Sequence, residues 1–178
     1  ALSDFLHLHL PEVGHVTHAL PVSGGCINTC LKLETSSTNY FIKYNDASAY
    51  PGMMAAEVYG LQLLHDTQTL STPSIILQKT FQDTDYLVLE WIEPAQELPN
   101  YWERFGEGLA ALHHNTSPYF GLEKDNYIGS LPQINTPTEN GIQFFIHHRL
   151  QPQLQFCIFD PNFAKIATLG LTLLLLSQ

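Results

Sequence analysis

A lysine inside an apolar segment is the first feature of this sequence that could do chemistry. Lys43 lies in "NYFIKYN", residues 39–45, whose tyrosines, phenylalanine and isoleucine favour a β-strand. The chain has only seven lysines and arginines, so a cation in such a strand calls for a reason. Either its stem carries the ammonium group to solvent, or the ammonium meets an anionic partner or ligand.

A carboxylate downstream offers this lysine a partner. Residues 53–66, "MMAAEVYGLQLLHD", have helical periodicity, and Glu57 falls within the apolar arc of that helix, between Leu61 and Leu64. A lone buried charge is costly, and a short loop joins the lysine strand to this helix. We therefore predict that Glu57 pairs with Lys43, with a solvated Glu57 at the edge of the helix as the alternative.

Two glycines upstream could complete an anion site. Gly24 and Gly25 lie in "VSGGCIN", residues 22–28, where their main-chain N–H groups could approach a phosphate. Gly-Gly is also a common hairpin turn, so the motif alone leaves both interpretations open. The order glycine turn, strand lysine, helix glutamate is that of a protein-kinase-like nucleotide lobe, in which the lysine holds the α- and β-phosphates.

The elements that must position these residues are mostly strands in the first part of the chain. We expect strands over residues 16–22, 26–34 and 40–45, the helix over 53–66, a hairpin from 74–80 and 86–92, and a second helix over 101–114. This order predicts an α+β fold with a five-stranded antiparallel sheet and one helix in a nucleotide-binding N-lobe, residues 1–92. A hinge or linker at 93–99, the start of a mostly helical C-lobe at 100–155 and an atypical apolar tail at 156–178 would follow.

The segment "YLVLEWIEP" has two compatible interpretations. It can be a plain buried strand, and its end can form the hinge between two lobes. Main-chain groups at Glu90, Trp91 and Ile92 could then hydrogen-bond an adenine between apolar side chains.

Composition limits the function classes. The net charge of −10 disfavours nucleic acid and anionic membrane surfaces as partners. The three cysteines form no CxxC pair and the nine histidines form no metal-binding motif, so we expect reduced thiols and no specific metal site. No secretory signal is evident and the apolar C-terminal run is short for a membrane span, so we expect a cytoplasmic protein.

The sequence also resembles the fructosamine kinase (ketosamine-3-kinase) family. The motifs that carry the resemblance are "SGGCINTCLKL", "YFIKYN", "PGMMAAEVYGLQLL", "YLVLEWIEP", "FGLEKDNYIGSLPQINT" and "FFIHHRLQPQL", of which the last two are the most specific. They span roughly residues 15–155. The family is similar in fold to aminoglycoside and choline kinases.

The resemblance implies a reaction and a set of site residues. The reaction is ATP-dependent phosphorylation of the sugar 3-hydroxyl of a ketosamine, as a small molecule or as a glycated protein lysine, with Mg²⁺. The implied cofactor-binding residues are Gly24, Gly25, Lys43, Glu57, Glu90, Trp91, Ile92 and Glu93.

The sequence departs from the family in places that bear on catalysis. Gly141 stands where the family usually has Trp, and His147 where it usually has Glu. The H-G-D-L-W-x-G-N segment, which supplies the base and a Mg²⁺ ligand, is absent, and we interpret Asp160–Pro161 as a chance match to the later metal ligand. We thus identify no catalytic residue and no metal ligand, and we expect little or no activity from this chain. A truncated or frameshifted gene would explain the missing segment.

Other function classes stay open. The chain could be a non-catalytic nucleotide-binding or protein-interaction module, or a degraded gene product without function. Helices that start a C-lobe would expose their apolar faces, which favours self-association.

Overall fold

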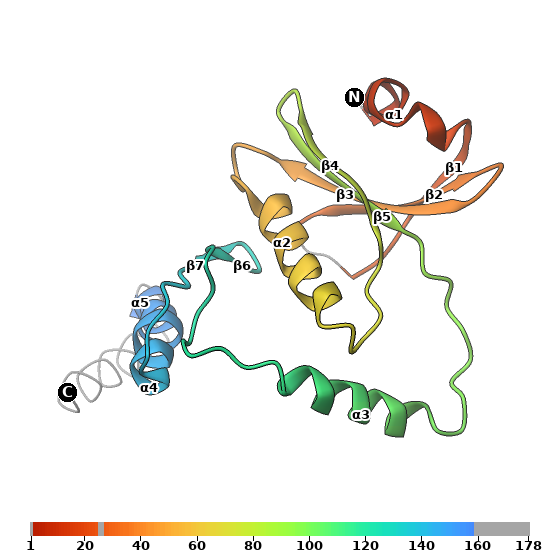
Figure 1. The fold of residues 1–178 in the computed structure, drawn as a ribbon. Helices are drawn as coiled ribbons and strands as arrows, with labels where there is room; N and C mark the ends of the chain where they lie inside the picture. Colours follow the sequence, from red (N-terminus) through yellow and green to blue (C-terminus); the bar gives the residue numbers. More distant parts are fainter. Residues whose placement is uncertain (1, 25–26, 159–178) are drawn as a thin grey trace. The chain divides into compact units, whose positions relative to one another are not determined.

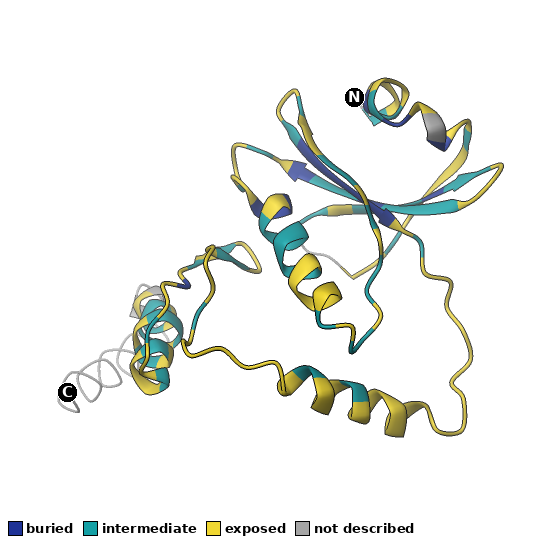
Figure 2. Cartoon of the chain, viewed as in Figure 1, coloured by how far each residue is buried: buried dark blue, intermediate teal, exposed yellow. Residues whose placement is uncertain are grey.

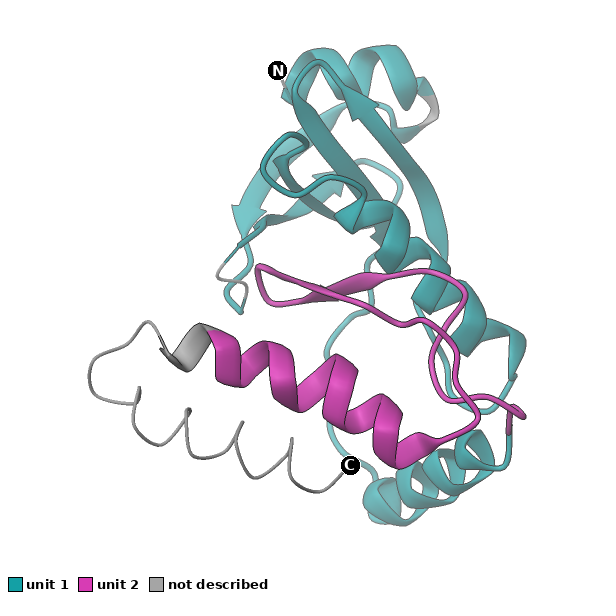
Figure 3. Ribbon diagram, turned by 90° about the vertical axis from the view of Figure 1, so that its left-hand side faces the viewer, with its two compact units in different colours: residues 1–115 teal, residues 116–178 magenta. Residues whose placement is uncertain are grey.

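The structure is a computed structural model that describes residues 2–24 and 27–158. It contains two compact units, Ala1–Asn115 and Thr116–Gln178 (Figure 3). This division falls after the second expected helix, whereas the sequence places a linker at residues 93–99, and the lobe boundary stays a prediction. Asp160 and most of the expected apolar tail lie outside the described residues.

The first unit is built on a five-stranded antiparallel sheet (Figure 1), which confirms the expected α+β fold. Its spatial order is β1-β2-β3-β5-β4, with β1 Val16–Pro21, β2 Thr29–Thr35, β3 Asn39–Asp46, β4 Ile75–Phe81 and β5 Thr84–Glu90. Strand β2 begins three residues later than expected. β5 begins earlier than expected, because Thr84 and Asp85 pair with β3 rather than form a turn.

Helix α2, Met53–Asp66, covers one face of the sheet and has the predicted bounds. Met54 of the helix and Leu87 of β5 are fully buried there, and Phe41 packs against them. The predicted apolar arc is only partly covered, because Leu64 at the C-terminal end of the helix is 42% exposed.

The opposite face is covered by an element that the sequence analysis missed. Helix α1, Leu2–His9, and the 3-10 turn η1, Pro11–Val13, pack on this side (Figure 1), and the sequence analysis assigned no helix to these residues. Phe5 of α1 is fully buried and stacks on Tyr86 of β5, with ring centroids 4.0 Å apart. Burial raises the pKa of that tyrosine. Figure 2 shows that the buried residues concentrate in the sheet between its two covers.

Helix α3, Tyr101–His113, ends the first unit and follows a segment without helix or strand. None of its residues is buried, and Trp102 and Phe105 are 66% and 42% exposed. These exposed aromatic side chains agree with the expected uncovered face, and self-association through it stays a prediction. No helix in the described part of the chain is both long and apolar enough to cross a membrane.

The second unit joins a small hairpin to a helical stretch. The hairpin strands are β6 Asn126–Ile128 and β7 Leu131–Gln133, and the helical elements are α4 Gly141–Phe145, the π-helix η2 Ile146–Leu150 and α5 Gln151–Ile158. The side chain of Asn140 caps α4 by accepting hydrogen bonds from the N–H groups of Ile142 and Gln143. The helical stretch was expected from the sequence and the hairpin was not.

A buried asparagine connects these two parts of the second unit. Asn135 is 1% exposed, and its Nδ2 donates to Oδ1 of Asn126 at 3.0 Å. The Arg149 guanidinium donates to Oδ1 of Asn135 at 2.5 Å. The same guanidinium donates to the carbonyl of Ile134 at 2.9 Å. Burial lowers the pKa of Arg149. The segments "NYIGSLPQINT" and "FFIHHRLQPQL" are therefore linked by direct hydrogen bonds.

The stacked pair beneath α1 generates a stability prediction. Phe5→Ala should lower the free energy of unfolding by about 3–5 kcal/mol, because it leaves a cavity in a fully buried site. Urea denaturation followed by circular dichroism measures the change. Leu8→Ala on the same helix is the matched control: Leu8 is 61% exposed, so it should cost no more than about 0.5 kcal/mol. Equal effects would contradict the packing described for α1.

A second prediction concerns the open end of the β4–β5 pair, where Ser74 precedes β4 and Glu90 ends β5. The side chain and main-chain N–H of Ser74 both donate to the Glu90 carboxylate, which lowers the pKa of Glu90 from its ordinary 4.5. The stabilisation is therefore complete above the unfolded-state pKa and is lost as the pH falls through the lowered folded-state value. Glu90→Gln should lower the urea midpoint near pH 7 and converge with the unsubstituted chain in acid. A difference that is constant with pH would contradict this.

Candidate functional site

The lysine and the glutamate singled out in the sequence lie in contact. Nζ of Lys43 on β3 is 2.6 Å from Oε2 of Glu57 on α2. The lysine side chain is 16% exposed and the glutamate side chain 32% exposed, so solvent screens this ion pair less than a surface pair. The ion pair forms because strand alternation places Lys43 on the sheet face that α2 covers.

The glycine loop begins next to this pair. Residues 22–28 connect β1 to β2, and the loop is closed where the N–H of Val22 donates to the carbonyl of Cys30 at 3.0 Å. Cys30 lies directly opposite Lys43 in the sheet. Gly24 is exposed and has a φ of 125°, a conformation that favours glycine. Gly25 lies outside the described residues.

A buried asparagine holds the loop, the strand and the helix together. Asn45 is 7% exposed, and its Nδ2 donates to Oδ1 of Asn28 at 2.8 Å and to Sδ of Met53 at 3.2 Å. Asn28 ends the glycine loop and Met53 begins α2. Asn45 thus fixes the relative positions of the elements that carry the ion pair, a role that the sequence analysis did not identify.

The Cys30 thiol is part of the same environment. Burial raises its pKa, the Lys43 ammonium partly opposes that rise and the Glu57 carboxylate adds to it. A thiol with a raised pKa is less often present as the nucleophilic thiolate.

The chain continues beyond the end of β5, where the hinge is expected, as an extended segment. Glu90 is held by Ser74, as described above, Trp91 is half-buried and Ile92 is 58% exposed. Within residues 2–24 and 27–158, the main-chain groups of residues 91–93 make no hydrogen bond to other main-chain groups. They therefore have donors and acceptors available for a planar heterocycle.

Side chains from two neighbouring strands hold this segment instead. Lys32 of β2 places its Nζ 5.0 Å from the ring centroid of Trp91 and 3.6 Å from Oε1 of Glu93. Nδ2 of Asn39, on β3, donates to the same carboxylate oxygen at 3.0 Å. The hydrogen bond to Glu34, aided by Glu93, raises the pKa of Lys32 against the lowering effect of burial. Sequence reasoning missed Lys32 and Asn39, because only the strand register brings them to the hinge.

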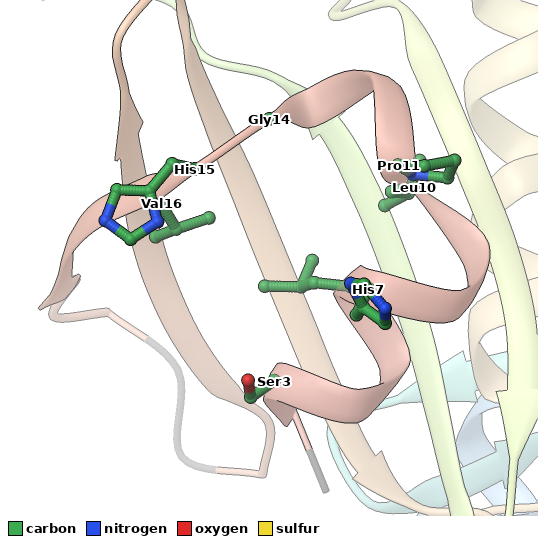
Figure 4. A pocket seen from close by; sticks show the side chains of 8 residues that line it. Ser3, His7, Leu10, Pro11, Gly14, His15 and Val16 are labelled. Atoms are coloured by element: carbon green, nitrogen blue, oxygen red, sulfur yellow. The ribbon is translucent and has the colours of Figure 1, made fainter.

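A cavity elsewhere in the first unit lacks such a grouping. A cavity of about 470 Å³ on the α1 side is lined by residues that include Ser3, His7 and His15. Its two imidazoles come from different segments and lie apart (Figure 4). In the described residues, no three His, Cys, Asp or Glu side chains cluster as a bound metal ion would require.

The arrangement in the first unit suits a nucleotide. A cation positioned by a carboxylate, next to a glycine loop, can bind phosphate oxygens. Free main-chain groups at residues 91–93 can hydrogen-bond a base. The described residues of the first unit thus bring a paired cation, a glycine loop and unpaired main-chain groups to one part of the fold.

Comparisons with known proteins show the family and the fold of the chain. The fructosamine kinase family matches over residues 1–169, a longer stretch than the motifs at 15–155. The chain is 42% identical over 134 residues to a probable ketoamine kinase of Synechocystis, covering 75% of this chain and 45% of the relative. It is 35% identical over 143 residues to the chloroplastic protein-ribulosamine 3-kinase of Arabidopsis thaliana, covering 79% and 43%.

Solved structures give the same result. A candidate fructosamine-3-kinase from Haemophilus somnus superposes with a TM-score of 0.78 at 25% identity, covering 88% of this chain and 53% of that one. A candidate fructosamine-3-kinase from Thermobifida fusca superposes with a TM-score of 0.67 at 30% identity, covering 79% of this chain and 49% of that one. Spectinomycin phosphotransferase, solved with ADP and spectinomycin, gives 0.53 at 19% identity and shows a shared fold.

The chain spans about half the length of the curated relatives that it matches. The family match nevertheless extends over nearly all of its 178 residues. The chain belongs to the fructosamine kinase family.

Proposed function

We propose that this chain forms the nucleotide-binding part of an ATP-dependent ketosamine kinase. The observation that carries the proposal is the Lys43–Glu57 ion pair, at 2.6 Å beside the glycine loop. The kinases that the chain resembles are named for ketoamines and ribulosamines. We extend this to transfer of the γ-phosphoryl group to the sugar 3-hydroxyl of fructosamine or ribulosamine adducts of lysine.

Each group at the site has a role in this proposal. Lys43 contacts the phosphates of ATP, and Glu57 holds its ammonium in place so that little side-chain entropy is lost on binding. Gly24 and Gly25 lie over the phosphates, where a side chain would keep the main chain away. The adenine is bound at Glu90, Trp91, Ile92 and Glu93, through main-chain groups and flanking apolar surface.

Phosphoryl transfer needs more than this site offers. Mg²⁺ would neutralise charge on the phosphates, and the sequence offers no identified ligand for it. The sequence also lacks the H-G-D segment that would supply the base. We therefore propose that this chain binds ATP while its own turnover of ketosamines is weak.

The binding half of the proposal is tested at Lys43. Lys43→Ala should weaken ATP binding about ten- to a hundredfold, because it removes a charge-assisted hydrogen bond to the phosphates. Isothermal titration calorimetry of the purified chain measures this. Lys79→Ala is the matched control, since Lys79 is an exposed lysine of β4, and it should bind ATP like the unsubstituted chain.

Two results would contradict the nucleotide site. One is an unsubstituted chain that does not bind ATP, which together with a defined protein partner would favour an interaction module. The other is a folded Lys43→Ala variant, checked by circular dichroism, that binds ATP with unchanged affinity.

The catalytic half is tested separately. With fructosyl-lysine, ATP and Mg²⁺, the purified chain should release ADP far more slowly than a full-length relative assayed alongside. A coupled ADP assay measures both rates. A rate equal to that of the relative would refute the weak-turnover proposal and leave the ATP-binding proposal intact.

A further inference from the structure

We propose that Lys32 is a positioning residue that orients residues 91–93 for reading the adenine base. It acts through the Trp91 ring and the Glu93 carboxylate, 5.0 Å and 3.6 Å from its Nζ. This inference rests on the nucleotide-binding function proposed above and adds a determinant of base recognition to it.

The register of the sheet places Lys32 and Lys43 on the same face. Cys30 pairs with Lys43 and Lys32 with Phe41, so the two lysines project from neighbouring strands on the side that α2 covers. Lys43 lies at the glycine-loop end of this face. Lys32 lies two residues further along β2, toward the end of β5 where the hinge segment begins. One cation therefore serves the phosphate end and the other the base end.

The contacts of Lys32 are more than a surface ion pair. Glu93 is 64% exposed, so its ion pair alone would contribute little. The lysine side chain, however, is only 18% exposed and its ammonium lies over the Trp91 ring, where a cation is attracted by the π-system. Asn39 holds the Glu93 carboxylate from β3, and Glu34 holds the ammonium at 3.1 Å.

These side-chain contacts determine how the segment lies. Among the described residues, 91–93 make no hydrogen bond to other main-chain groups. The orientation of their N–H and C=O groups is therefore set by the side chains of Trp91 and Glu93 and the residues that hold them. Loss of the Lys32 ammonium should disturb contacts to the base and leave contacts to the phosphates at Lys43 unchanged.

The experiment compares ATP with inorganic tripolyphosphate, which has the phosphates and no base. Both affinities are measured by calorimetry at about 0.15 M salt, where charges beyond about 8 Å are largely screened. Lys32→Met should weaken ATP binding about three- to tenfold and leave tripolyphosphate binding within about twofold. Retained tripolyphosphate binding also shows that the variant is folded. Lys32→Arg keeps the cation over the ring and should restore most of the ATP affinity.

Glu93→Gln separates positioning from simple charge. Removal of a negative charge near the site should strengthen anion binding if only electrostatics matter, whereas positioning predicts weaker ATP binding. An unsubstituted chain that does not bind ATP overturns this inference and the proposed function together. ATP bound normally by Lys32→Met, or ATP and tripolyphosphate weakened equally, overturns this inference alone.

Discussion

The ion pair between Lys43 and Glu57 is the constraint on which the rest of the first unit depends. Two partly buried charges repay their desolvation only at close range and in good geometry, and here they lie 2.6 Å apart. That distance requires β3 and α2 to keep a fixed relative position. The buried contact between Met54 and Leu87, together with the Asn45 hydrogen bonds, provides it. Packing and polar contacts therefore serve the same alignment.

The sheet can hold this alignment because both of its faces are covered. One face packs against α2 and carries the two lysines, and the other is covered by Phe5 of α1, Val13 of η1 and Leu10 between them. Strand β5 contributes to both cores, since Leu87 faces α2 while Val88 faces α1. A substitution in the core beneath α1 therefore affects β5, the strand that leads into the expected hinge.

The sequence predicted what depends on local pattern. Lys43 and Glu57 were found because each breaks the apolar periodicity of its own segment, and the bounds of α2 follow from the same periodicity. Helix α1 was missed because its burial depends on a sheet assembled from later residues. Lys32 and Asn45 were missed for a related reason, since their partners Trp91 and Asn28 are distant in sequence and meet them only through strand register. Cross-strand contacts are thus the part of the site that pattern analysis could not supply.

The distribution of contacts also explains how nucleotide binding could be separate from phosphoryl transfer. Lys43 and Gly24, proposed to bind the phosphates, and Lys32 and Trp91, proposed to act at the base, all lie within the first unit. Their geometry is fixed by the five-stranded sheet and its two covers, which need no residue beyond Asn115. Among the described residues, no three His, Cys, Asp or Glu side chains cluster as a bound metal ion would require. The proposed nucleotide contacts therefore depend on residues other than a hydroxyl-activating base or metal ligands.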